Sequence, residues 1–170
     1  MTDVRITHEI DCNEETFWTK CFFDEEFNRK LFLDWLAFPV WRILKQETRD
    51  DGTTVRSIET QPKLENVPGP MKKLIGDKLS YTESGTYSKS TRRYEFSIVP
   101  SALADKAKIN GVMYCEPLGE KKIRRVVELH VEVKVFAIVK MVEDKIAEDV
   151  RTNYDKAAVF TNQWVREKGY

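Results

Sequence analysis

The stretch Val127-Glu128-Leu129-His130-Val131-Glu132-Val133-Lys134-Val135, together with the residues that follow it, decides the fold of this chain. Apolar and polar residues alternate along the stretch, which is the pattern of a β-strand buried on one face. After Phe136 the apolar spacing changes to three and four residues, which predicts an amphipathic helix reaching almost to the last residue. The apolar stripe of this helix consists of Val139, Val142, Ile146, Val150, Asn153, Ala157, Phe160 and Trp164.

A helix of about 30 residues is about 45 Å long, which is the width of a domain of this size. Such a helix needs a curved sheet to lie against, and a curved sheet around one helix often leaves a cavity between the two. The sequence therefore indicates a container for a ligand.

The segments before this strand supply the rest of the sheet. Alternating or β-rich patterns predict strands at 3–10, 37–48, 53–61, 78–88, 92–99, 107–116 and 121–135. Their separators are short and polar, and Asp50-Asp51-Gly52 is a hairpin-turn signal, so the last six strands are expected to pair consecutively as a meander. Pro39 marks the entry or an edge of its strand.

Three helical segments are expected between these strands. Two short helices follow the first strand, with Asn13 and Asp24 as their N-caps. The connection 62–76 contains three prolines and predicts a loop with one or two helical turns, starting near Pro70 and ending at Gly76.

Composition describes an ordinary globular protein and excludes several classes. The 170 residues carry 28 acidic and 28 basic side chains, and this balance gives no pull toward nucleic acid. The first residues lack the pattern of a signal peptide, and the longest apolar runs are too short to span a membrane. The three cysteines contain no CxxC pair and are expected to be free thiols in a reducing cytosol. We expect one cytoplasmic domain over residues 1–170.

This order of elements, β-α-α, a six-stranded meander and a long C-terminal helix, resembles the START-like, or Bet v 1-like, helix-grip superfamily (SRPBCC) over nearly the whole chain. Two segments are similar to an uncharacterised bacterial group of START-like, lipid-binding proteins. They are Val67-Pro68-Gly69-Pro70-Met71-Lys72-Lys73-Leu74-Ile75-Gly76 and Phe22-Phe23-Asp24-Glu25-Glu26-Phe27, and the second is also similar to sterol-binding VASt relatives. The resemblance implies an α+β helix-grip fold with a hydrophobic tunnel for lipids, sterols, polyketides or similar molecules. It also implies that some relatives are enzymes.

Two ionisable residues fall on apolar strand faces. Glu83 shares a face with Tyr81 and Tyr87, and burial would raise the pKa of its carboxyl, as a general acid or a ligand anchor requires. The alternatives are an edge position where Glu83 reaches solvent, or an ion pair with a cation such as Lys45. His8, between Ile6 and Ile10, is either a hydrogen-bonded core residue or a donor to a ligand.

Other positions are candidates for the lining and for a lid. Asn153 interrupts the apolar stripe of the long helix and needs partners from a ligand, a water or the protein, and Ala157 leaves space beside it. Tyr81, Tyr87, Phe96 and Met113 either line a cavity or fill a core. Met71, Leu74 and Ile75 form an amphipathic segment with Lys72 and Lys73. This segment is either a packed loop helix or a lid that makes transient contact with a membrane.

The remaining charged and nucleophilic residues carry no motif. Arg92-Arg93 and Arg124-Arg125 are expected to be solvated strand-end charges, and His130 a surface residue beside Glu128 and Glu132. The two histidines have no metal-ligand spacing, and neither a GxSxG motif nor a glycine-rich phosphate loop is present, so we expect no metal and no cofactor.

Three functions remain open. The first is noncatalytic binding or transfer of a hydrophobic small molecule, lipid- or sterol-like, between the curved sheet and the helix. The second is a cavity enzyme, such as a cyclase, dehydratase or hydrolase, that uses Glu83 and His8 on an apolar substrate. The third is a protein-interaction module with a solid core and an exposed apolar patch.

Overall fold

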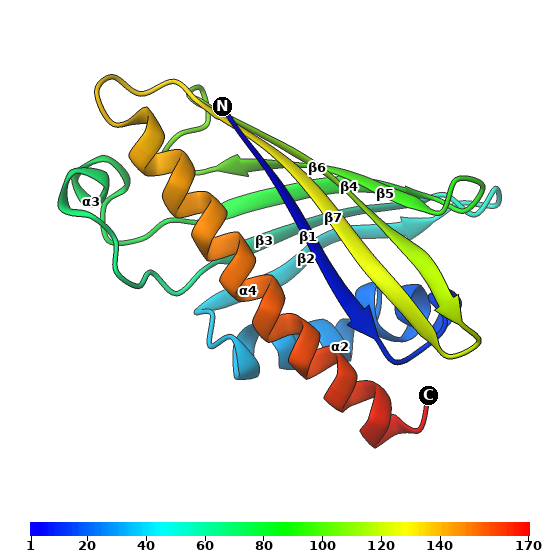
Figure 1. The fold of residues 1–170 in the computed structure, drawn as a ribbon. Helices are drawn as coiled ribbons and strands as arrows, with labels where there is room; N and C mark the ends of the chain where they lie inside the picture. Colours follow the sequence, from blue (N-terminus) through cyan, green and yellow to red (C-terminus); the bar gives the residue numbers. More distant parts are fainter.

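The computed structural model describes residues 1–170 as a seven-stranded antiparallel sheet bent around a long helix (Figure 1). The elements in chain order are β1 (Thr2–Ile10), α1 (Glu14–Thr16), the π-helical turn η1 (Phe17–Phe22), α2 (Glu25–Arg29), the π-helical turn η2 (Lys30–Trp35), β2 (Val40–Thr48), β3 (Thr54–Gln61), α3 (Gly69–Ile75), β4 (Tyr81–Ser88), β5 (Arg93–Pro100), β6 (Ala107–Gly119), β7 (Lys122–Val133) and α4 (Val139–Lys168). This is the predicted α+β helix-grip fold.

The sheet has the strand order β1-β7-β6-β5-β4-β3-β2. Strands β2 to β7 therefore form the expected meander. Strand β1 pairs with β7 and forms one edge of the sheet, and β2 forms the other edge. The β2–β3 turn is built as the sequence predicts: Gly52 has a positive φ of 80°, and the Asp51 carboxylate accepts a hydrogen bond of 2.8 Å from the Thr53 backbone N–H.

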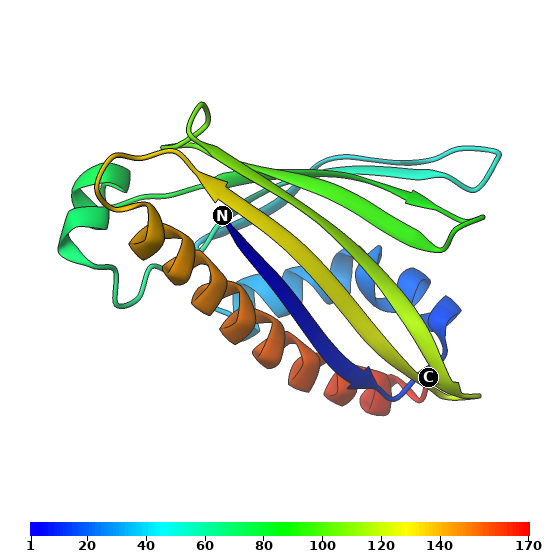
Figure 2. The same cartoon turned by 45° about the horizontal axis from the view of Figure 1, so that its top comes forward.

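The 30-residue helix α4 lies on the concave side of the sheet, along β1 and β7 (Figures 1 and 2). Its apolar stripe supplies buried side chains near both ends, including Val142 and Trp164. The short helical segments between β1 and β2 lie on the same side and contact α4 through η2 and through Phe27 of α2. Helices therefore cover only one face of the sheet.

The alternation of β7 places Val127, Leu129 and Val131 in the core. His130 lies on the outer face as expected, where its Nδ1 is 2.7 Å from Oδ1 of Asp3 on β1. One hydrophobic cluster joins the inner face of the sheet, the short helices and α4. The concave side is therefore where the core and any interior site must be.

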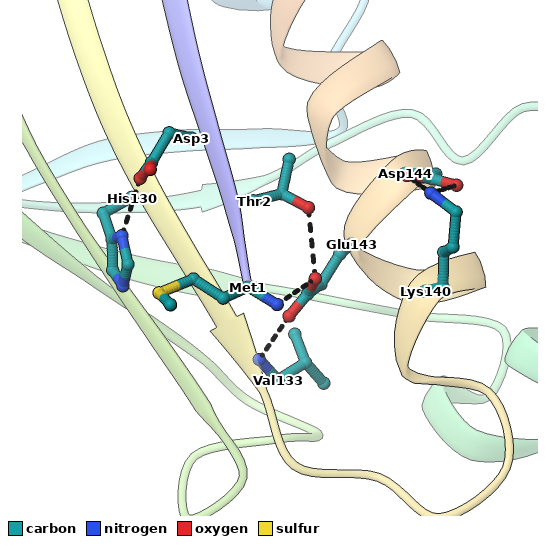
Figure 3. A network of polar contacts seen from close by, with 8 residues as sticks. All are labelled: Met1, Thr2, Asp3, His130, Val133, Lys140, Glu143 and Asp144. Atoms are coloured by element: carbon teal, nitrogen blue, oxygen red, sulfur yellow. Dashed lines mark hydrogen bonds and ion pairs between the residues drawn. The ribbon is translucent and has the colours of Figure 1, made fainter.

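Glu143 attaches the first turns of α4 to the sheet (Figure 3). Its side chain is 4% exposed and accepts hydrogen bonds from the Val133 backbone N–H at 3.0 Å and the Thr2 hydroxyl at 3.1 Å. The Met1 amino group lies 2.6 Å from the same carboxylate. Burial alone would raise the pKa of this carboxyl, but these donors together lower it, so Glu143 is held as an anion.

Several boundaries differ from the predicted ones. The strand expected from residue 37 begins at Val40, because Ala37 takes a positive φ of 53° and the Phe38 N–H still bonds to the Phe32 carbonyl of the preceding helical turn. The strand expected at 78–88 begins at Tyr81, and the last strand ends at Val133. No helix combines the length and apolar character needed to cross a membrane.

The predicted helix caps are confirmed. The Asn13 and Asp24 side chains accept hydrogen bonds from the backbone N–H groups of Thr16 at 2.8 Å and Phe27 at 2.7 Å. Helix α3 contains Pro70 in its first turn and ends at Ile75, and the residue that caps it, Gly76, has a φ of 70°.

Candidate functional site

The middle of α4 is less buried than its two ends. Ile146, Val150 and Tyr154 lie in the stretch between the buried residues near each end, and they are only half-buried. Tyr81, Glu83 and Ile98 on the inner face of β4 and β5 are half-buried as well, although they point toward the core side of the sheet. We call these six residues the inner site; Ile98, Ile146, Val150 and Tyr154 pack against the buried cluster without being fully covered by it.

Glu83 is the charged residue of the inner site. Its Oε1 accepts hydrogen bonds from Arg56 Nη2 at 3.1 Å and from the Tyr94 hydroxyl at 2.9 Å. The side chains of Arg56 and Glu83 are 4% and 14% exposed, so their ion pair is largely shielded from water. The cation that neutralises Glu83 is therefore Arg56. On β3, Arg56 lies two residues from Ile58, the residue that pairs with Glu83 across the strands. Lys45 instead pairs with Glu47.

Aromatic rings hold the Arg56 guanidinium in place. Its carbon Cζ lies 4.1 Å from the ring centre of Phe22, and its Nη1 donates a 2.8 Å hydrogen bond to the Phe22 carbonyl. The rings of Tyr94 and Phe23 lie 5.3 and 5.6 Å from Cζ. Arg56 Nε is buried without an acceptor. Stacking on aromatic faces is a favourable environment for a buried guanidinium, and it fixes the donor that faces Glu83.

Tyr94 reaches Glu83 because Gly85 has no side chain. A Cβ atom added at Gly85 would lie 2.3 Å from Cζ of Tyr94, so the tyrosine ring lies directly on the glycine backbone. Burial, followed by the negative charge of Glu83, raises the pKa of the Tyr94 phenol. The phenol therefore keeps its proton and donates it to the carboxylate as a hydrogen bond.

The second oxygen of Glu83, Oε2, accepts no hydrogen bond from the protein and is not enclosed. The charge of Glu83 also acts on two phenols of the inner site. Burial, and then the charge of Glu83, raises the pKa of Tyr154 to about 12 and also raises that of Tyr81. The inner site therefore offers one free carboxylate oxygen and two protonated hydroxyl groups within apolar walls, which is the composition of a small-molecule site.

His8 belongs to a different cluster. Its Nε2 lies 2.7 Å from Oδ1 of Asp155, and its Nδ1 lies 2.9 Å from Nη2 of Arg125. Burial lowers the pKa of the imidazole, although the contact with Asp155 opposes that shift. Strands β7, β6 and β5 separate His8 on β1 from Glu83 on β4, and no hydrogen bond connects the two clusters.

The other residues predicted for the site divide into two groups. Phe96, Met113 and Ala157 are buried in the hydrophobic cluster and therefore belong to the filled core. Tyr87 and Asn153 are half-buried; the Tyr87 ring packs 4.6 Å from that of Trp18, and the side chain of Asn153 makes no hydrogen bond to the protein.

The predicted lid residues lie in α3, at the same end of the molecule as the start of α4 (Figure 1). Met71 and Ile75 are buried in the hydrophobic cluster, and Leu74 is partly buried against it. Lys72 and Lys73 are exposed. The apolar side of α3 therefore packs on the body of the molecule in this structure.

Sequence reasoning missed the two buried arginines. The expectation that Arg125 is a solvated strand-end charge is wrong, because only 4% of this residue is exposed. Arg125 lies two and four residues before Val127 and Leu129, and Arg56 lies two residues before Ile58. Residues two apart in a strand lie on the same face, and this spacing was the signal that places both arginines on the inner face. Arg124, one residue away from Arg125, is partly exposed and pairs with Glu116 as a surface residue.

Two open hollows lie outside the inner site. One, of about 490 Å³, lies between η2 and the end of α4 and includes Trp35, Phe160 and Trp164. The other, of about 510 Å³, lies beside α2 and β2 and includes Arg29 and Trp41. Both are lined mostly by polar or charged residues, unlike the apolar walls of the inner site.

Solved structures with the same fold include two named as enzymes and one named only by its superfamily. A norcoclaurine synthase mutant from Thalictrum flavum, bound to a transition-state analogue, is 16% identical, with a TM-score of 0.66 over 99% of this chain and 96% of that one. The Zhui aromatase/cyclase from Streptomyces sp. R1128 is 11% identical, with a TM-score of 0.64 over 97% and 94% of the two chains. A START superfamily protein from Mycobacterium smegmatis is 19% identical, with a TM-score of 0.60 over 97% of each chain.

These likenesses establish a START/Bet v 1-like fold, and their low identities leave the activity open. No curated protein matches the sequence. Residues 5–165 match the family described as protein of unknown function (DUF2505), and the chain therefore belongs to that family.

Proposed function

We propose that this protein binds a mainly apolar small molecule, lipid- or sterol-like, at the inner site, and that it does so without catalysis. The observation that carries the proposal is that the middle of α4 and the inner face of β4 and β5 both present half-buried side chains on the concave side of the sheet. A ligand there would cover Ile98, Ile146 and Val150, and removal of apolar surface from water is the main driving force for such binding.

The polar groups of the inner site indicate how the ligand would be oriented. The free oxygen of Glu83 accepts a hydrogen bond, and a ligand hydroxyl is a suitable donor. Arg56 and Tyr94 hold the carboxylate in position before the ligand arrives, so little conformational freedom is lost on binding. The proposed ligand is therefore an apolar body with at least one hydroxyl or similar donor.

The experiment is a titration with Nile red, a neutral dye that fluoresces in apolar surroundings. We expect saturable binding to the wild-type protein and at least about a tenfold weaker affinity in Val150→Trp, because the larger side chain would stand where the ligand is proposed to lie. Val159→Trp is the matched control: Val159 is on the same helix and is exposed on its outer side, so its replacement should leave the affinity unchanged.

The titration has clear opposing results. Absence of saturable dye binding by the wild-type protein would overturn the proposal. Equal loss of affinity in the two tryptophan variants would also overturn it, because the dye would then bind somewhere other than the inner site. Thermal melts of both variants confirm that each is folded at the temperature of the titration.

The alternative is an enzyme of the same fold acting on an apolar substrate. The named activities of two structural neighbours, an aromatase/cyclase and a norcoclaurine synthase, favour it at the level of fold. Glu83 and His8 lie in separate clusters, so such an enzyme would have to use Glu83 with its immediate neighbours Tyr94 and Tyr81. Recovery of chemically unchanged ligand after prolonged incubation with the protein favours binding, whereas conversion that depends on Glu83 favours the enzyme.

A further inference from the structure

The inner face of the sheet carries two buried arginines, and only one has a carboxylate partner. Arg56 pairs directly with Glu83 at 3.1 Å. Arg125, on β7 and 4% exposed, is not within ion-pair distance of any carboxylate. A buried guanidinium without a counter-ion is unusual, because a charge moved out of water is normally paired.

The contacts of Arg125 use only part of its hydrogen-bonding capacity. Its Nη2 donates to His8 Nδ1 at 2.9 Å and to the Tyr154 carbonyl at 3.2 Å, and its Cζ lies 5.0 Å from the Tyr154 ring centre. Nε is buried with no acceptor, and Nη1 donates to no protein atom and is not enclosed. Three of the five N–H bonds of a guanidinium are therefore unused.

The neighbours of Arg125 do not neutralise it. Because a guanidinium can only donate, His8 Nδ1 must accept, which leaves the imidazole proton on Nε2, where it donates to Asp155. His8 is thus a neutral link between the buried cation and Asp155, whose side chain is 70% exposed. Cys115, its cross-strand neighbour on β6, is a thiol whose pKa burial raises, so it stays uncharged.

Arg125 also adjoins the inner site. The Tyr154 ring packs on its guanidinium, and the pKa of the same tyrosine responds to the charge of Glu83. Tyr154, a member of the inner site, therefore contacts Arg125 through both its ring and its backbone carbonyl. We propose that the ligand of the inner site carries a single negative charge, most simply a carboxylate, which pairs with Arg125 while the apolar body lies against α4. This inference rests on the proposed function and adds the chemical class of the ligand.

The test uses displacement of Nile red by two competitors of equal chain length, dodecanoate and dodecan-1-ol, below their micellar concentrations. We expect the acid to displace the dye from the wild-type protein at about tenfold lower concentration than the alcohol, because a charge-assisted hydrogen bond to Arg125 is available only to the acid. In Arg125→Met the two should become equal to within about twofold. Arg124→Met, the adjacent outward-facing arginine, should behave as wild type.

A second variant tests the charge argument without changing Arg125. Asp155→Asn removes the remote counter-charge of the cation, so the acid should bind about two- to threefold more tightly while the alcohol is unaffected. Arg125→Lys keeps the charge and should keep part of the acid preference. These two variants decide the question if thermal melts show that Arg125→Met does not fold.

The outcomes separate the two proposals. Failure of the wild-type protein to bind Nile red overturns the proposed function and this inference together. Dye binding with equal displacement by acid and alcohol, or with no displacement by the acid, overturns only the anionic ligand. An acid preference that is unchanged in every folded variant of Arg125 and Asp155 also overturns it, because the charge would then be recognised elsewhere.

Discussion

At the scale of single residues, the ion pair of Arg56 and Glu83 is the most consequential contact of the inner site. Both charges are largely buried and neutralise each other, so removal of one partner leaves the other as an uncompensated buried charge. We expect Arg56→Met to lower the free energy of unfolding by about 3 kcal/mol. The double variant Arg56→Met/Glu83→Gln should recover a substantial part of that loss. Urea unfolding of the wild type, both single variants and the double variant measures this coupling.

The opposing result for this cycle is additivity. If the double variant loses as much stability as the two single variants combined, the two charges do not compensate each other. Lys45→Met is the matched control, because Lys45 pairs with Glu47 on the surface and its loss should change stability by less than about 1 kcal/mol.

Strand alternation alone predicted that Glu83 faces inward with Tyr81, and the structure places it there. The identity of its cation could not be predicted, because that depends on the register between β3 and β4, which sets Ile58 opposite Glu83 and brings Arg56 alongside. The role of Gly85 could not be predicted either, because it depends on the pairing with the next strand, to which the ring of Tyr94 belongs.

At the scale of elements, the attachment of α4 by Glu143 makes a prediction with a defined pH dependence. The pKa of Glu143 is lower in the folded protein than in the unfolded chain, so its contribution to stability is present above the unfolded pKa of about 4.3. That contribution is lost as the pH falls through the folded value. We expect Glu143→Gln to cost about 2 kcal/mol at pH 7 and progressively less below about pH 4, measured by urea unfolding.

Asp144→Asn provides the comparison for this experiment. Asp144 is the next residue, and its exposed carboxylate pairs with Lys140 at 3.0 Å within the helix, so its replacement should cost less than about 0.5 kcal/mol. A cost for Glu143→Gln that stays constant from pH 7 to pH 3 would contradict the account, because it would arise from packing and not from the charge.

Elements were predictable to the extent that local patterns define them. The change of apolar period after Phe136 located the long helix, and side-chain caps located the starts of α1 and α2. The start of β2 was not predictable, because it depends on the left-handed conformation of Ala37. The π-helical turns η1 and η2 were missed as well, because their extra residue per turn leaves no clear mark on a short apolar pattern.

At the scale of the whole molecule, the concave sheet and α4 create an interior whose use depends on the side chains within it. Structures of the same fold carry names as different as START superfamily protein and aromatase/cyclase, so the fold alone does not select a function. The order of elements in the sequence was sufficient to predict the curved sheet and its helix. Whether the interior is filled could not be predicted, because it depends on how far each side chain reaches across it.

The central claim is that an apolar ligand lies between the middle of α4 and the inner face of the sheet. The most direct measurement is a set of intermolecular nuclear Overhauser effects from bound Nile red to assigned methyl groups of the protein. We expect contacts with Ile98, Ile146 and Val150, which pack against the core cluster, and none with the exposed Val99 and Val159. Contacts confined to Val99, Val159 or the hollow beside Trp35 would contradict it.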